Sequence, residues 1–90
     1  MVSIRESYDI AFRICTKIRE DVDMPTGVIV YPSAWYTDYF VITIRAAKGD
    51  VVEMVRDYLE VLMKEYPGWF NTRISMDSDM YHIHFNYENS

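Results

Sequence analysis

The chain has few of the residues that build disulfide scaffolds or phosphate-binding loops. Its 90 residues include a single cysteine, Cys15, so no internal disulfide can form. Only three glycines occur, widely spaced, which excludes a glycine-rich loop of the kind that holds a phosphate. No apolar run approaches the roughly 18 residues that a membrane-spanning helix needs. We expect no membrane association and no N-terminal leader, and therefore a cytoplasmic protein with a buried, unreactive Cys15.

Clusters of positive charge and catalytic motifs are missing as well. The 9 Lys and Arg residues stand against 14 Asp and Glu, for a net charge of −5, and the cations are not grouped. Because nucleic-acid backbones are bound by grouped cations, we expect no direct contact with nucleic acid. The motifs Cys-x-x-Cys, His-Glu-x-x-His and Gly-x-Ser-x-Gly do not occur. We predict that the chain is not an enzyme and requires no cofactor.

Apolar and aromatic residues are abundant instead. Hydrophobic residues make up 50% of the chain and aromatic residues 16%, which is too apolar for a disordered segment. The length fits one domain over residues 1–90. The 8 Tyr, 4 Phe and 2 Trp exceed what the core of so small a domain easily encloses. Several rings are therefore expected at the surface or in an interface.

The first amphipathic segment predicts a helix over residues 4–22. Ser3 and Glu6 have the spacing of a capping box at its start, and Pro25 follows its end. Apolar residues recur at alternating four- and three-residue steps, which places them on one face of a helix. The predicted buried stripe comprises Ile4, Tyr8, Ala11, Cys15, Ile18 and Val22.

A second amphipathic segment predicts a helix that begins at Asp50, its N-cap, and stops at residues 67–68. Glu53, Asp57 and Glu60 lie on its polar side and form a candidate acidic contact face. Its predicted buried stripe comprises Val51, Val52, Val55, Tyr58, Leu59, Leu62, Met63 and Tyr66.

Four segments with alternating or β-branched residues predict strands. The first ends at Pro32, and a loop over residues 32–38 joins it to the second. The order of elements is helix, hairpin, helix, hairpin, which predicts an α+β, αββαββ two-layer sandwich. Both helices would lie on one face of a four-stranded antiparallel sheet, a circularly permuted ferredoxin-like topology. The predicted strands cover residues 27–31, 39–47, 71–76 and 80–87.

Two groups of residues are candidates for contact with a partner. Trp35 and Tyr36 belong to the polar loop between the first two strands, and Tyr39 lies just beyond it. Trp and Tyr are enriched among residues that dominate interface energy. A core-capping position for Trp35 is an equal alternative. Val41 and Arg45 point to the sheet face that no helix covers, and such a face suits a second copy or another partner.

His82 and His84 are the one pair with metal-ligand spacing. Two residues apart on a strand, their imidazoles point to the same sheet face, and imidazole is a common ligand of zinc and nickel. The alternative is that both are ordinary polar residues on a solvent-facing strand.

In size, acidity and absence of catalytic motifs, the chain is similar to the small acidic proteins that phages and bacteria use as stoichiometric inhibitors or immunity proteins. The hypothesis is a protein–protein interaction module that covers a partner's functional surface, such as that of a basic nucleic-acid-binding protein. The alternative hypothesis is a homodimeric domain that binds a small ligand or a metal on the open sheet face.

Overall fold

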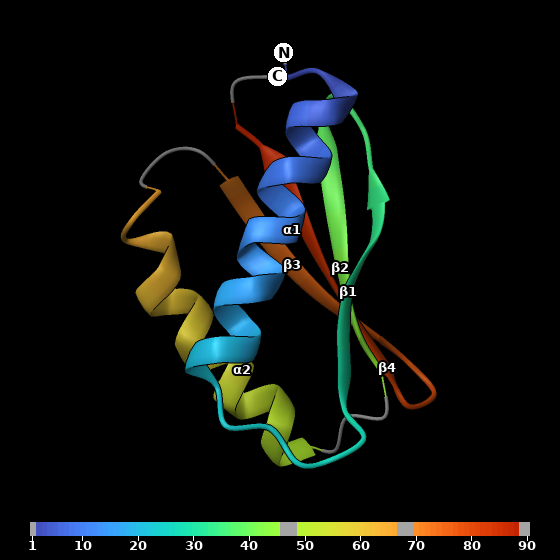
Figure 1. Ribbon diagram of the computed structural model, residues 1–90, viewed down its shortest axis with the longest axis vertical. Helices are drawn as coiled ribbons and strands as arrows, with labels where there is room; N and C mark the ends of the chain where they lie inside the picture. Colours follow the sequence, from blue (N-terminus) through green and yellow to red (C-terminus); the bar gives the residue numbers. More distant parts are fainter. Residues whose placement is uncertain (1, 46–48, 67–69, 89–90) are drawn as a thin grey trace.

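Two helices and a four-stranded antiparallel sheet form an α+β, two-layer protein, which confirms the predicted fold class (Figure 1). The computed structural model describes residues 2–45, 49–66 and 70–88. The permuted ferredoxin-like description of this arrangement stays a prediction. In chain order the elements are α1 (Ile4–Asp21), β1 (Ile29–Trp35), β2 (Tyr39–Arg45), α2 (Gly49–Met63), β3 (Phe70–Asp77) and β4 (Met80–Tyr87).

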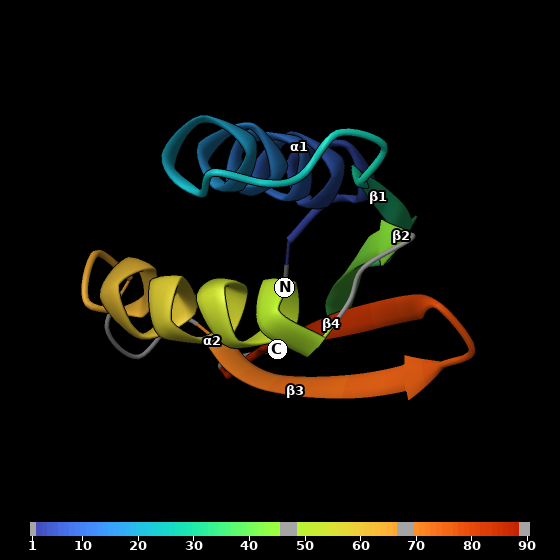
Figure 2. The ribbon, with the colours of Figure 1, turned by 90° about the horizontal axis from the view of Figure 1, so that it is seen from below.

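The sheet has the strand order β1-β2-β4-β3, so β2 and β4 are central and β1 and β3 are edges. The register pairs Ile42 of β2 with Ile83 of β4, and Phe40 with Phe85. Both helices lie on the same side of the curved sheet, α1 beside β1 and β2, and α2 beside β3 and β4 (Figure 2). The opposite side of the sheet, called here the open sheet face, has no helix over it among the described residues.

The core fills the space between the helices and the sheet. The rings of Phe40 and Phe85 stack with centroids 4.6 Å apart, and Phe70 meets Phe40 edge-on at 5.5 Å. Cys15 is fully buried, as predicted. Burial raises the pKa of its thiol to about 12, so the thiolate form is scarce at neutral pH.

The buried face of α1 differs from the predicted stripe in its first half. Ser7 is fully buried, whereas Ile4 and Tyr8 are 56% and 37% exposed. The Tyr87 hydroxyl donates a 3.0 Å hydrogen bond to the Ser7 Oγ atom, and both groups lie away from water. Because a buried hydroxyl needs a partner, this bond favours a helix orientation that brings Ser7 inward and leaves Ile4 and Tyr8 outside.

The N-terminus of α1 has the predicted cap. The Glu6 backbone N–H donates to the Ser3 Oγ atom at 3.1 Å. The Glu6 carboxylate accepts from the Ser3 hydroxyl at 3.0 Å, instead of from the Ser3 backbone amide as in the standard capping box. The helix therefore begins where the sequence predicts.

Strand β1 is longer than predicted. It continues through Pro32 to Trp35, and only residues 36–38 connect it to β2. Proline is tolerated because β1 is an edge strand and its outer side needs no ladder hydrogen bond. The register shifts between Pro32 and Ala34, which is the signature of a β-bulge.

Smaller differences concern the ends of the second helix. α2 begins at Gly49, so Asp50 lies in its first turn and is not its N-cap. Tyr66 lies beyond the end of α2. The predicted stop at 67–68 and the predicted extension of the second strand to residue 47 fall outside the described residues. Neither described helix combines the length and hydropathy needed to cross a membrane.

Candidate functional site

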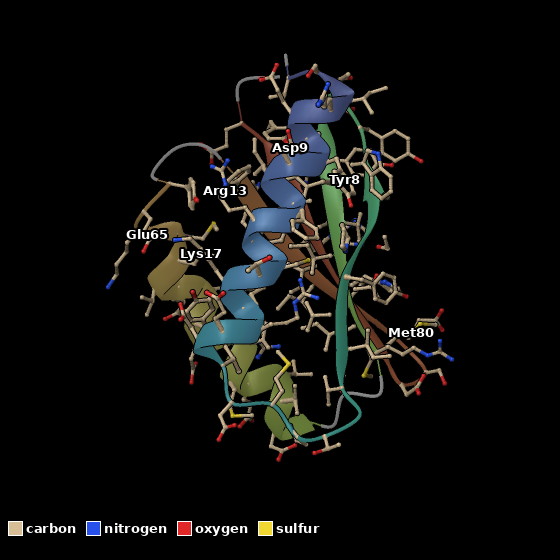
Figure 3. The ribbon with its side chains drawn as sticks, viewed as in Figure 1. Tyr8, Asp9, Arg13, Lys17, Glu65 and Met80 are labelled. Atoms are coloured by element: carbon tan, nitrogen blue, oxygen red, sulfur yellow. The ribbon has the colours of Figure 1, made fainter. Side chains whose placement is uncertain are left out.

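Large apolar side chains remain exposed on the side of α1 that faces β1. The Tyr8 ring meets Trp35 of β1 edge-on with centroids 4.8 Å apart, and it stacks on Phe12 at 6.1 Å. Figure 3 shows Tyr8 directed from α1 toward β1. Tyr8 and Trp35 are each 37% exposed and Phe12 is 48% exposed. We call Ile4, Tyr8, Phe12 and Trp35 the aromatic surface.

The local structure explains how this surface forms. Residues four apart on a helix are neighbours, so Ile4, Tyr8 and Phe12 form one row along α1. In β1, Trp35 pairs with Phe40, a core residue, so its side chain lies on the helix side of the sheet. The edge-to-face contact with Tyr8 then follows from the placement of β1 beside α1. Trp35 therefore packs on Tyr8 and leaves 37% of its surface in solvent.

The two other predicted aromatic anchors form a separate pair at the turn between β1 and β2. The rings of Tyr36 and Tyr39 lie 4.8 Å apart. The Tyr36 backbone N–H donates to the Tyr39 carbonyl at 2.8 Å, which closes the hairpin. Tyr36 is 49% exposed. Tyr39 directly precedes the core residue Phe40, so its side chain points to the opposite side of the sheet from Trp35. The pair is therefore a second exposed aromatic group, separate from the aromatic surface.

The open sheet face is less exposed than the sequence indicates. Val41 is 7% exposed and Thr43 is fully buried, although both point away from the helices. Thr43 lies between Tyr31 and His82 in the register, and these are larger side chains that shield it. Arg45, at the end of β2, is exposed as expected. Val41 therefore leaves little apolar area in water, although it points to the open sheet face.

The predicted acidic residues lie apart from the aromatic surface. Glu53, Asp57 and Glu60 are exposed on α2, as their helical spacing predicts. Tyr8 of the aromatic surface is directed toward β1, where it meets Trp35, whereas α2 lies on the other side of α1 (Figures 1 and 3). The two groups cannot be treated as one continuous contact face.

Two polar contacts link α1 to α2 and to the segment that follows α2. The Lys17 ammonium and the Glu65 carboxylate are 2.9 Å apart, and Figure 3 shows these side chains directed toward each other. The Tyr58 hydroxyl donates a short hydrogen bond to the Asp21 carboxylate. Burial, and then the hydrogen bond to Asp21, raise the pKa of the Tyr58 phenol above its usual value.

A row of polar groups crosses the open sheet face. Ser33 donates to the Val41 carbonyl at 3.3 Å, Thr43 donates to Ser33 at 2.7 Å, and the Thr43 hydroxyl lies 2.8 Å from the His82 Nδ1 atom. The Ser75 Oγ atom lies 3.3 Å from the His84 Nε2 atom. Burial, and then the charge of Arg73, lower the pKa of the His84 imidazole. Both effects favour the neutral form of the His84 imidazole.

Two features of the described residues bear on catalytic chemistry, the grouping of possible metal ligands and the state of the Cys15 thiol. No group of three or more His, Cys, Asp or Glu side chains there could hold a metal ion by itself. No third side chain of these types among the described residues thus completes a site with His82 and His84. The Cys15 thiol, fully buried and with its raised pKa, is no nucleophile.

Sequence reasoning missed Ile4, Tyr8 and Phe12 as surface residues. Ser7, Ala11, Ile14 and Ile18 form a second stripe at the same helical spacing, and the structure buries this one. The sequence contains one sign of the exposed row. The aromatic Phe12 lies beside the predicted buried stripe and not within it. The stripe that contains Ser7 was not predicted to be buried, because Ser7 is polar. Its hydrogen-bond partner Tyr87 lies 80 residues away in the sequence, so the sequence does not indicate the bond.

Comparisons with known proteins add no assignment to this geometry. No protein-family model matches the chain, and no curated protein or solved structure matches it. The function is therefore inferred from the residues themselves.

Proposed function

We propose that the protein is a protein–protein interaction module that binds a partner through the aromatic surface. The observation that supports this most strongly is the cluster of Tyr8, Phe12 and Trp35, in which the Tyr8 ring contacts the other two while 37% to 48% of each residue stays in solvent. Exposed apolar groups that are contiguous mark interaction sites more often than scattered ones do. Trp and Tyr are also the residues that most often dominate the energy of protein interfaces.

The cluster is held in place before any partner binds. Tyr8 is fixed on one side by Phe12 on its own helix and on the other by Trp35 of β1. Ordering a free side chain at an interface costs about 0.5–1.5 kcal/mol, and rings that are already packed avoid most of this loss. A rigid aromatic surface therefore suits tight binding of one partner.

The mode of action that fits these features is occlusion of a partner's functional surface. The chain would act as a stoichiometric inhibitor or immunity-type protein, in the cytoplasm. A net charge of −5 favours a partner with a basic surface, such as a nucleic-acid-binding protein. Glu53, Asp57 and Glu60 on α2 remain candidate acidic contacts on a separate face, and Tyr36 and Tyr39 a candidate second aromatic contact.

Affinity capture from the native lysate, with matched variants, tests this proposal. The test variant is Phe12→Ala, which removes the outermost ring of the cluster. The control is Val61→Ala, because Val61 is an apolar residue on α2 with 57% exposure. We expect the wild type and Val61→Ala to retain the same dominant partner, and Phe12→Ala to lose most of it. Retention of that partner by all three proteins, or no dominant partner for the wild type, would overturn the proposal.

A further inference from the structure

The hydrogen bonds across the open sheet face determine which nitrogen of His82 holds the proton. The chain of bonds ends at the Val41 carbonyl, which can only accept, so the Ser33 hydroxyl must donate to it. The Thr43 hydroxyl donates its one proton to Ser33. The Thr43 oxygen can then only accept from His82, so the His82 Nδ1 atom must be the donor.

This tautomer leaves a lone pair on the other ring nitrogen of His82. A neutral imidazole that is protonated at Nδ1 has an unprotonated Nε2 atom. No hydrogen bond joins that Nε2 atom to another of the described residues. The His82 ring is thus oriented through Thr43, Ser33 and a backbone carbonyl, with one nitrogen available to a ligand.

A second imidazole lies on the same face. His84 is two residues along β4, so its side chain points to the same side of the sheet as that of His82. The Ser75 Oγ atom of the neighbouring strand lies 3.3 Å from the His84 Nε2 atom. The His84 Nδ1 atom does not make this contact. Two imidazoles, each with one nitrogen held by a hydroxyl, therefore lie next to each other on β4.

We propose that His82 and His84 form an open binding site for a divalent transition metal such as Cu²⁺, Ni²⁺ or Zn²⁺. Metal-bound histidines almost always donate their other ring N–H to an oxygen, and the His82 Nδ1–H has this partner before any metal binds. Imidazole suits these three metals in particular. Two protein ligands leave the remaining coordination positions to water or to an external ligand. Arg73, which is paired with His84 in the register, favours an anionic group there.

Metal titration of the untagged protein by calorimetry tests the site. We expect one ion to bind per chain, with Cu²⁺ tighter than Ni²⁺ or Zn²⁺, as the general order of affinities requires. His82→Asn should abolish this binding. Thr43→Val keeps both imidazoles and removes the oxygen that orients His82, so it should weaken binding by about 10- to 100-fold. The matched control is Thr72→Val, the same change on the helix-facing side of β3, which should bind metal as the wild type does.

A second measurement, without metal, keeps the inference testable if a variant does not fold. Long-range ¹H–¹⁵N correlation spectra distinguish the two tautomers of a neutral histidine. We expect the Nδ1–H form for His82 in the wild type. The Nε2–H form for His82, unchanged metal binding in His82→Asn, or no binding by the wild type would each overturn the proposal. The site is independent of the aromatic surface, so partner capture does not affect this test.

Discussion

The aromatic surface and the open sheet face differ in how much of their side chains stays in contact with water. On the aromatic surface, Tyr8 and Phe12 contact each other and still leave 37% and 48% of their area in water. On the open sheet face, Val41 and Thr43 are almost fully covered, and the hydroxyl of Thr43 is hydrogen-bonded. The first surface has apolar area available to a partner, whereas the second offers mainly polar groups.

The difference arises from what each side chain has beside it. On a sheet, cross-strand neighbours lie about 4.5–5.5 Å apart and can cover a smaller residue between them. On the outer side of a helix, no such neighbours exist, and a ring stays exposed unless another element approaches. Self-association through the open sheet face stays a prediction, but the burial of Val41 removes the apolar area that motivated it.

Val41→Glu should have the largest effect on stability. Because Val41 is 7% exposed, a carboxylate there would lose its hydration without a partner built for it. We expect the free energy of unfolding to fall by at least about 2 kcal/mol, whereas Tyr8→Glu on the aromatic surface should change it by less than about 1 kcal/mol. Urea denaturation of both variants measures this. Equal losses would mean that the two surfaces do not differ in burial.

Ser7→Ala should have the next largest effect. The change removes the hydroxyl that accepts from Tyr87, so the buried phenol loses this partner. We expect a loss of about 1–3 kcal/mol in the free energy of unfolding. Tyr87→Phe together with Ser7→Ala should recover part of it, since neither polar group then remains buried. An unchanged denaturation midpoint for Ser7→Ala would contradict the buried face assigned to α1.

The sequence predicted the elements well because periodicity is a local property. Ser3 and Glu6 placed the start of α1 correctly, and the alternation of β4 placed His82 and His84 on one face. The orientation of α1 could not be predicted, since it depends on Ser7 meeting Tyr87 at the far end of the chain.

The burial of the open sheet face and the tautomer inferred for His82 could not be predicted from the sequence either. Both depend on the register of β2 against its neighbours, which pairs Thr43 with His82 across 39 residues. The first strand was predicted too short because a proline such as Pro32 usually indicates the end of a strand. An edge strand tolerates proline, and the sequence does not show that β1 lies at the edge.

Ser3→Ala should have a moderate effect, confined to the start of the helix that bears the aromatic surface. The Glu6 amide would lose its acceptor, which costs about 0.5–2 kcal/mol for a typical N-cap. Hydrogen exchange should accelerate in the first turn of α1 and stay unchanged in the sheet. Equal acceleration in β4 would show that the two regions do not open independently.

The smallest effect concerns pH and the contact between the helices. The raised pKa of Tyr58 means that the unfolded chain releases this proton first as pH increases from the usual tyrosine value of 10.0. The contribution of Tyr58 to the free energy of unfolding is therefore fully present below pH 10.0 and is lost as the pH rises above that value. Tyr58→Phe should show a flatter loss of stability than the wild type between about pH 9 and pH 11. Identical pH profiles would contradict the contact with Asp21.

The most direct test of the central claim compares the affinity of the captured partner for one variant on each surface. Phe12→Ala alters the aromatic surface, and Arg45→Ala alters the exposed end of β2 on the open sheet face. We predict that Phe12→Ala weakens binding by about tenfold or more, the effect of an interface residue worth at least 1.4 kcal/mol. Arg45→Ala should leave the dissociation constant nearly unchanged. The opposite result, with binding lost in Arg45→Ala and retained in Phe12→Ala, would place the contact on the sheet and contradict the assignment.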